Sequence, residues 1–314
     1  MGRLSTQQIA DRRLGIGSSD VATVLGLSPY QGNTPLALWL EKTGQAIEVE
    51  RDEMALDLGH LLEPVLLGVF EAQSGLTVLR EGEGVESVSH PDHPWRRPNL
   101  DGRIKDKRAA VEVKVVGVGM MRDWDFNSDD GIPHYVRVQV AWQMHVADLD
   151  MVFVVALIGG TTFRVYEVAR DLDIERQIVA VCSAFWHRVT TRAEPEVDGS
   201  AIARAWLNRL YPPREPEVVV TLDPYDAADR PVIRLAHARI VDAATERAAK
   251  SSKDIATNAL IKAMGERECD VLYLPGEWRA SYRVQGKKGR IFTLRSLAPV
   301  GAVATGNADD GEVL

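Results

Sequence analysis

The sequence predicts an α/β fold in which helices flank a central mixed β-sheet, followed by a C-terminal extension of helix and β-hairpin. Residues 99–116 are typical of a strand, a charged turn and a second strand rich in valine. Residues 151–168 are typical of a β-hairpin that turns at a pair of glycines. Apolar periodicity indicates a helix over residues 57–72, and another helix is expected from residue 132. This order of elements predicts one mixed sheet covered by helices.

Caps and apolar stripes predict the individual helices. Thr34, followed by a proline, predicts the start of a helix that ends at Gly44. The helix over residues 57–72 is expected to face the core with one apolar stripe. The members of this stripe are Leu58, Leu61, Leu62, Val65, Leu66, Val69 and Phe70. A later helix, capped by Asp171, carries Cys182 on its apolar stripe, which predicts a buried and inert thiol.

A proline-rich stretch at residues 212–216 marks a domain boundary. The first domain is expected to comprise residues 1–211, with its packed core ending near residue 195. Residues 212–298 are expected to form one long helix or two shorter ones, then two strands and a basic turn into a third. The tail, residues 299–314, is small and acidic, and we expect it to be disordered.

The composition is that of an ordinary globular chain. Of the 314 residues, 45% are hydrophobic and 26% are charged. No apolar run reaches the length of a membrane span, and residues 1–13 are too polar for a signal peptide. The two cysteines, Cys182 and Cys269, are too few for a disulfide framework or an iron–sulfur cluster. We therefore expect a cytoplasmic protein with no membrane partner.

The net charge of −8 is weak evidence against a nucleic-acid partner, so a binder of this kind must gather its basic residues locally. Such a run lies between Glu277 and Ser296, where six basic residues stand against one acid. The basic residues are Arg279, Arg283, Lys287, Lys288, Arg290 and Arg295. Aromatic residues are interleaved with them. The run either follows a DNA backbone or forms a solvated hairpin.

The candidate catalytic residues lie in the first pair of strands. Glu112 and Lys114 are two positions apart in a strand, so they share one face, while the neighbouring valines take the other. A carboxylate and an ammonium are costly to bury unless a metal or a ligand uses them. Asp101 can add a second carboxylate from the adjoining strand. The pattern indicates a site for a hard cation beside a lysine; the alternative is a solvated ion pair on an edge strand.

Two segments nearer the N-terminus are also open to two interpretations. Arg12 and Arg13 precede a Gly/Ser turn and the start of a helix, which favours either phosphate binding or a plain helix cap. Ser19 or Asp20 would provide that cap. Glu63 lies at the edge of an apolar helical stripe, where a surface glutamate is the simplest interpretation.

Two further segments contain aromatic or amide side chains. Trp95, with Arg96 and Arg97, either grips DNA or packs over the edge of the sheet. Gln139 lies on the helix that starts near residue 132, where glutamines often face solvent.

The order of these motifs resembles that of a known family. Asp-Gly, a short turn and Glu-Val-Lys are similar to the core of the PD-(D/E)xK nuclease superfamily, although the nearest preceding proline, Pro98, is not adjacent to the aspartate. The Arg/Gly/Ser opening, the Gly-x-x-x-Glu-Pro helix and the string Gln-Val-Ala-Trp-Gln-Met resemble the YqaJ-like viral recombinases, relatives of the lambda-type phage exonucleases. The resemblance covers about residues 12–190 and implies a restriction-endonuclease-like core.

The resemblance implies a role for each residue of the cation site. Asp101 and Glu112 would bind Mg²⁺ with the carbonyl of Val113, and Mn²⁺ could replace Mg²⁺. Glu63 would complete the metal site. Lys114 would orient the attacking water or stabilise the charge that develops on the phosphate.

The resemblance also implies contacts with DNA. Gln139 would touch the catalytic lysine or the DNA, whereas Ala141 replaces a further glutamine that is common in this string. Ser19 would hold the 5′-phosphate of the DNA together with an arginine. Whether Arg12 or Arg13 is that arginine stays open.

Taken as a whole, the resemblance implies a Mg²⁺-dependent exonuclease that degrades double-stranded DNA from 5′ to 3′ and leaves 3′ overhangs for recombination by strand annealing. Its implied partners are double-stranded DNA ends, a single-strand annealing protein and sister subunits in a ring such as a trimer. It would act in the cytoplasm of a bacterium or of a phage-infected host. The alternatives are a structure- or sequence-specific endonuclease of the same superfamily and a non-catalytic DNA-binding accessory.

Overall fold

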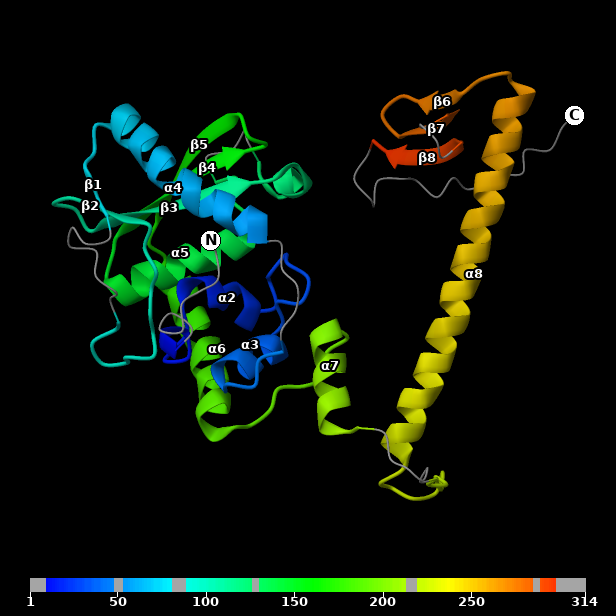
Figure 1. The fold of residues 1–314 in the computed structure, drawn as a ribbon, viewed down its shortest axis with the longest axis horizontal. Coiled ribbons are helices and arrows are strands. Elements are labelled where there is room, and N and C mark those ends of the chain that lie inside the picture. Colours follow the sequence, from blue (N-terminus) through cyan, green and yellow to red (C-terminus); the bar gives the residue numbers. More distant parts are fainter. Residues whose placement is uncertain are drawn as a thin grey trace, which may run out of the picture. The chain divides into compact units, whose positions relative to one another are not determined.

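The structure is a computed structural model that describes residues 10–47, 53–80, 89–125, 130–212, 219–284 and 289–297. The chain divides into two compact units, Met1–Pro213 and Arg214–Leu314 (Figure 1). The predicted tail, residues 299–314, lies outside the described residues. None of the helices in the described ranges combines the length and the apolar character that a membrane span requires.

A five-stranded mixed sheet forms the centre of the first unit (Figure 1). In spatial order its strands are β1 (Val78–Leu79), β2 (Gly102–Ile104), β3 (Ala109–Val116), β4 (Met151–Ile158) and β5 (Thr162–Ala169). Strands β3 and β4 are parallel, and the other neighbouring pairs are antiparallel. The predicted fold class, a mixed sheet flanked by helices, is confirmed. Strand β3 has a neighbour on each side, which decides the environment of its charged residues.

Helices cover both faces of the sheet (Figure 1). On one face, α4 (Glu53–Ser74) packs over the odd-numbered residues of β3. The buried residues of this layer are Leu66, Leu67, Phe70, Val78, Ile104, Ala109, Val111 and Val155. On the other face, α5 (His134–Ala147) connects β3 to β4 and packs over their even-numbered residues. The alternation along β3 is therefore the one that a strand period of two predicts.

A group of helices packs beside α5 around a second apolar cluster. Its members are α2 (Ser18–Val24), α3 (Pro35–Lys42), α6 (Leu172–Thr191) and α7 (Ala201–Leu210). Trp206 of α7 meets Trp39 of α3 edge to face, with ring centroids 6.4 Å apart. The expectation that the core ends near residue 195 is therefore wrong. Helix α7 escaped detection because Ala203 and Trp206 are its only buried residues, too few to show a helical period.

The predicted caps are partly correct. Thr34 Oγ1 accepts a hydrogen bond of 3.2 Å from the backbone N–H of Ala37, and Gly44 ends the same helix with a φ of +78°. The predicted cap of α2 is wrong. Gly17 is the N-cap and helix α2 starts at Ser18, two residues before Asp20, which instead accepts a hydrogen bond of 2.9 Å from the N–H of Gly17.

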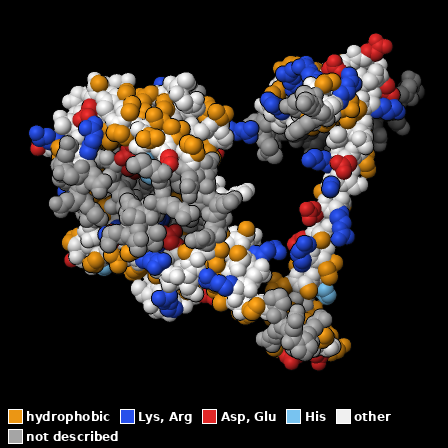
Figure 2. Space-filling view, in the orientation of Figure 1, with side chains coloured by type: hydrophobic (Ala, Val, Ile, Leu, Met, Phe, Trp, Pro, Cys, Tyr) orange, Lys and Arg blue, Asp and Glu red, His pale blue; other side chains and the backbone are white. Residues whose placement is uncertain are grey.

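The apolar stripe of α4 is divided between core and solvent. Leu66 and Phe70 are buried as predicted, but Leu61 is 71% exposed and Val65 is 58% exposed. Among the side chains of this helix that the structure describes, the exposed large apolar ones are Met54, Leu58, Leu61, Val65 and Val69. Figure 2 shows hydrophobic side chains gathered over α4. The single-stripe prediction fails because the apolar residues span a wider arc than one contact with the sheet can cover.

The second unit contains one long helix, α8 (Arg230–Glu266), and a three-stranded antiparallel sheet (Figure 1). The strands are β6 (Val271–Leu274), β7 (Trp278–Val284) and β8 (Arg290–Ser296), with β7 in the middle. Met264 and Ala280 are the buried residues of this unit within the described ranges. Lys287 and Lys288 lie outside the described residues.

The two cysteines are expected to differ sharply in reactivity. Cys182 is fully buried in α6, and burial raises the pKa of its thiol to about 12. At pH 8 only about one thiol in ten thousand would then be ionised. We expect iodoacetamide to alkylate the partly exposed Cys269 of the folded chain and to spare Cys182, with both modified in guanidinium, as measured by peptide mass spectrometry. Equal rates at both cysteines of the folded chain would contradict this expectation.

Candidate active site

The β2–β3 pair brings the predicted catalytic residues together. Asp101 immediately precedes β2, and its Oδ2 accepts a hydrogen bond of 2.7 Å from the backbone N–H of Val113. Glu112 is 3% exposed, and its Oε1 lies 2.6 Å from Nζ of Lys114. Because β3 is an interior strand, the alternative of a solvated pair on an edge strand is wrong.

Two glutamines of α5 hold these groups from above the sheet. Gln139 Oε1 accepts a hydrogen bond of 2.9 Å from Lys114 Nζ, while Gln139 Nε2 donates one of 2.6 Å to Glu112 Oε1. Gln143 Nε2 donates to Glu112 Oε2 at 2.6 Å and to the carbonyl of Asn99 at 2.6 Å. Gln139 therefore does not face solvent. Sequence reasoning missed Gln143 as a site residue, although its spacing of four from Gln139 places both on one helical face.

The site concentrates negative charge around one lysine. Burial raises the pKa of Asp101 well above its ordinary value, and the carboxylates of Glu112 and then Glu63 raise it further. Burial lowers the pKa of Lys114, but the adjacent Glu112 carboxylate outweighs this effect and the net pKa is raised. Lys114 is therefore a charged ammonium at neutral pH. The charge of Glu63 on α4 therefore affects the pKa of the candidate carboxylate Asp101.

The residues present fit a hard cation. Asp101 and Glu112 supply carboxylate oxygens, which Mg²⁺ prefers as ligands. One ammonium does not balance three carboxylates, and buried carboxylates repel each other unless positive charge is added. Within the described ranges, however, no three His, Cys, Asp or Glu side chains are already drawn together as a metal-binding group. Glu63 acts on the site through charge, and the structure does not place it as a direct ligand.

Comparison with known proteins agrees with this geometry. Residues 9–150 match the YqaJ-like viral recombinase domain. These residues belong to that family. The predicted resemblance is thereby confirmed, and the YqaJ-like domain contains every predicted site residue together with Gln143.

Individual relatives extend the comparison. The chain is 31% identical over 217 residues to the uncharacterized protein YqaJ of Bacillus subtilis (strain 168), covering 68% of this chain and 66% of that relative, which is just under two thirds of its length. The crystal structure of LHK-Exo with dAMP shares 18% identity and a TM-score of 0.48, covering 66% of this chain and 98% of that one. LHK-Exo is an alkaline exonuclease from Laribacter hongkongensis. A phage-related exonuclease from Haemophilus somnus 129PT shares 9% identity and a TM-score of 0.38, covering 57% of this chain and 96% of that one.

Near the start of the YqaJ-like domain, helix α2 contacts the segment that leads to Asp101. Ser18 Oγ is 3.3 Å from both the backbone N–H and the carbonyl of Asn99, two residues before Asp101. The next residue of α2, Ser19, has an exposed side chain. Ser19 therefore directly follows the residue that contacts the segment before Asp101.

The two candidate arginines differ in their surroundings. The guanidinium of Arg12 is paired with Asp20 at 3.3 Å and with Glu41 at 2.9 Å. Arg13 is exposed and forms no ion pair with any residue in the described ranges. The charge of Arg12 is therefore already balanced within the protein, whereas that of Arg13 is not.

Two residues of the aromatic segment before β2 pack within the protein. Trp95 stacks on Trp186 with ring centroids 5.9 Å apart and an interplanar angle of 11°. Arg96 is buried, and its Nη1 lies 3.1 Å from Nε2 of His145. Trp95 and Arg96 therefore pack within the protein, as one of the two interpretations predicted, but they pack against α5 and α6 and not over the edge of the sheet.

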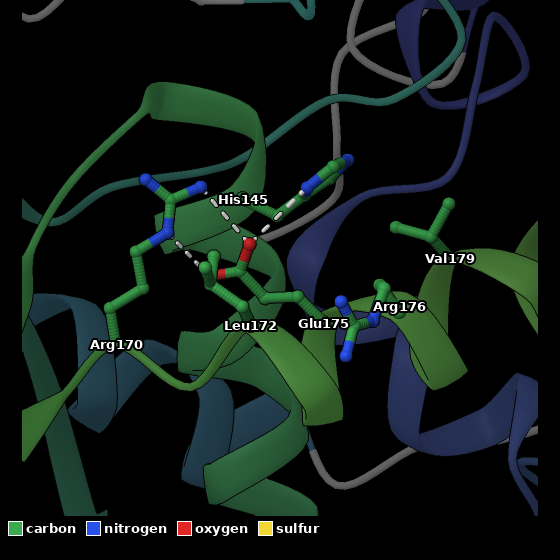
Figure 3. A pocket seen from close by; sticks show the side chains of 6 residues that line it. All are labelled: His145, Arg170, Leu172, Glu175, Arg176 and Val179. Atoms are coloured by element: carbon green, nitrogen blue, oxygen red, sulfur yellow. Dashed lines mark hydrogen bonds and ion pairs between the residues drawn. The ribbon is translucent and has the colours of Figure 1, made fainter.

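A surface pocket beside α6 is built from other residues (Figure 3). Its lining comprises His145, Arg170, Leu172, Glu175, Arg176 and Val179, none of which belongs to the predicted site. At its centre Arg170 donates two hydrogen bonds, of 2.8 and 3.0 Å, to the buried carboxylate of Glu175. His145 Nδ1 lies 3.4 Å from the same carboxylate. Arg170 and His145 therefore provide partners for the buried carboxylate of Glu175. These polar residues of the pocket are explained by contacts within the protein.

Proposed function

We propose that the protein is a metal-dependent deoxyribonuclease that degrades double-stranded DNA from 5′ ends and leaves 3′ single-stranded overhangs. One observation carries the proposal: two glutamines hold Glu112 and Lys114 of an interior strand, beside Asp101, inside a YqaJ-like domain. A binding module has no reason to bury such a costly group of charges.

Asp101 and Glu112 would hold Mg²⁺, with the carbonyl of Val113 as a further ligand and Glu63 helping to seat a second ion. Mn²⁺ could take the same oxygen ligands. A divalent ion bound there supplies Lewis-acid neutralisation of the phosphate charge. The hydrogen bond from Val113 to Asp101 supports this assignment, because it fixes the position of one carboxylate relative to β3.

Lys114 would orient the attacking water or stabilise the negative charge that develops on the phosphate during hydrolysis. Gln139 would act as a positioning residue, because it contacts both Lys114 and Glu112. Gln143 has the same role for the second oxygen of Glu112. Together the two amides restrict the rotamers of the catalytic pair, which lowers the cost of reaching a productive geometry.

Ser19 and an arginine would hold the terminal 5′-phosphate and so select 5′ ends. The exposed and unpaired state of Arg13, within the described residues, supports Arg13 over Arg12. We expect Arg13→Gln to reduce cleavage of 5′-phosphorylated duplex about tenfold while affecting 5′-hydroxyl duplex much less. Initial rates on the two substrates test this, with Arg209→Gln as an exposed control. A loss that is equal on both substrates would remove Arg13 from phosphate recognition.

The proposal includes a cytoplasmic setting and two protein partners. A single-strand annealing protein would take up the 3′ overhang, and sister subunits would form a ring such as a trimer. The exposed apolar row on α4 supports self-association, because monomers seldom leave such rows uncovered. The mass of the full chain in solution, compared between wild type and Val65→Glu, tests this part of the proposal. A monomer at all concentrations would exclude the ring.

The decisive experiment compares linear duplex, with and without 5′-phosphates, and covalently closed circles, each in Mg²⁺ or EDTA. Mg²⁺-dependent loss of linear DNA alone, with 3′ overhangs as products, is the expected result. Cutting of closed circles would favour an endonuclease of the same superfamily. Intact DNA in every reaction, with binding unaffected by Mg²⁺, would favour a non-catalytic accessory.

A further inference from the structure

The sheet of the second unit has one basic face. Strands β7 and β8 pair with Arg279 opposite Arg295 and Ser281 opposite Thr293. Cross-strand partners project from the same side of a sheet, and Arg283 shares that side because side chains alternate along a strand. The hydroxyls of Ser281 and Thr293 lie 2.7 Å apart, which is the contact that this register requires. We call Arg279, Arg283 and Arg295, with these two hydroxyls between them, the arginine face.

The opposite side of the sheet is apolar. Ala280 is completely buried there, and its neighbours Tyr282 and Phe292 are half-buried. Arg290 belongs to this second side, where its guanidinium lies over the ring of Tyr282 and 3.4 Å from Asp270. The charge of Arg290 is therefore paired within the protein, and Arg290 is not part of the arginine face.

The arginine face carries uncompensated charge. All three of its arginines are exposed, and none forms an ion pair with a residue in the described ranges. Strands β6, β7 and β8 contain no acidic residue. Arg279 and Arg295 are direct cross-strand neighbours, so their like charges destabilise the sheet. Figure 2 shows Lys and Arg side chains gathered over this sheet.

Protection of a sheet edge does not explain these charges. Proteins place cations on edge strands to prevent pairing with other chains. Arg279 and Arg283, however, lie on β7, which is the middle strand. Tyr273 of β6 faces Arg279 and is 59% exposed, so an aromatic ring lies beside the guanidinium groups. Guanidinium groups, hydroxyls and an exposed aromatic ring are the groups that bind nucleic-acid phosphates and bases.

We propose that the arginine face binds the phosphate backbone of DNA without sequence preference, as a contact separate from the YqaJ-like domain. The proposal deepens the proposed nuclease function, because the DNA would be the substrate or the product strand of the same enzyme. The net charge of −8 opposes DNA binding by the chain as a whole, so a local cationic surface is needed.

The test is equilibrium binding of the full chain to labelled DNA in EDTA, where a metal-dependent nuclease is silent. Fluorescence anisotropy is recorded over a series of NaCl concentrations with duplex and with single-stranded oligonucleotides. The variant combines Arg279→Gln, Arg283→Gln and Arg295→Gln. The matched control removes the same charge from exposed positions of α8 by Arg234→Gln, Arg239→Gln and Arg247→Gln.

Loss of three phosphate contacts reduces the slope of log K against log salt by about 2 to 3. We therefore expect the arginine-face variant to show this smaller slope, with affinity reduced at least about tenfold at low salt. The α8 control is expected to keep the wild-type slope. A variant with three lysines in place of the arginines should restore most of the slope, because the charge is retained. Comparing duplex and single strand shows which form the face holds.

Equal weakening by the arginine-face variant and the α8 control would overturn the proposal, and so would no weakening by either. Circular dichroism checks that the variant keeps its fold, which removal of repelling charges should not harm. The outcome is separable from that of the proposed function. If DNA binding depends on the arginine face but the wild type cleaves no DNA, only the nuclease proposal is contradicted. If the wild type cleaves DNA and the arginine-face variant binds DNA as the wild type does, only the proposal for the arginine face is contradicted.

Discussion

Replacing Lys114 with methionine is expected to reduce Mg²⁺-dependent DNA cleavage by about 10²- to 10³-fold. Lys114 is the one cation within hydrogen-bond distance of Glu112 among the described residues, and it shares Gln139 with that carboxylate. Methionine keeps most of the length of the side chain but supplies neither charge nor donor. Gln139 and Gln143 still hold Glu112 in the variant, so the loss should appear in kcat more than in the stability of the fold.

The control for this experiment is Lys105→Met, which removes the same charge from an exposed position in the turn between β2 and β3. Initial rates on linear duplex, with folding checked by circular dichroism, compare the two variants. A Lys114→Met enzyme as active as the Lys105→Met control would mean that the lysine only balances charge and takes no part in the chemistry.

Replacing Asp101 with asparagine is expected to have opposite effects on activity and on stability. Burial, then the carboxylates of Glu112 and Glu63, raise the pKa of Asp101 in the folded state. The ionised group therefore destabilises the metal-free fold, and its contribution becomes more unfavourable as pH rises from the unfolded pKa through the folded one. Asparagine can still accept the hydrogen bond from Val113 but carries no charge. Cleavage should be lost while the metal-free protein becomes more stable.

The expected gain is about 1 kcal/mol, or roughly 2–4 °C in Tm for a unit of this size at neutral pH. Millimolar Mg²⁺ should raise the Tm of the wild type by linkage and leave that of Asp101→Asn nearly unchanged. Differential scanning fluorimetry in EDTA and in Mg²⁺ measures both effects, with the exposed Asp92→Asn as control. A lower Tm for Asp101→Asn in EDTA would show that the carboxylate stabilises the metal-free fold, contrary to the raised pKa.

Several features of the fold were predictable because short-range rules decide them. The hydroxyl of Thr34 and the conformation of Gly44 define the ends of α3 without help from distant residues. The glycine pair at 159 and 160, both with positive φ, turns β4 into β5. The shared face of Glu112 and Lys114 follows from the two-residue period of any strand. Motif order extended this reasoning to the family, which the match over residues 9–150 confirms.

Other features depended on contacts between segments far apart in the sequence. The apolar residues of α4 outnumber those that the sheet can cover, so the sequence did not reveal which of them, such as Val65, stay exposed. Helix α7 joins the core through Trp206 and Trp39, which are distant in sequence and leave no periodic signal. Similarly, the pairing of Arg12 with Glu41 joins residues that are 29 positions apart in the sequence.

By itself the sequence determined the residue types of the candidate site, the face that each occupies on its own strand or helix, and the family. Only the tertiary structure decided that β3 lies inside the sheet, so that Glu112 is buried and needs two glutamines of α5 to satisfy it. The physical reason is that backbone geometry sets the direction of a side chain locally, whereas burial and pKa depend on which distant segments pack around it.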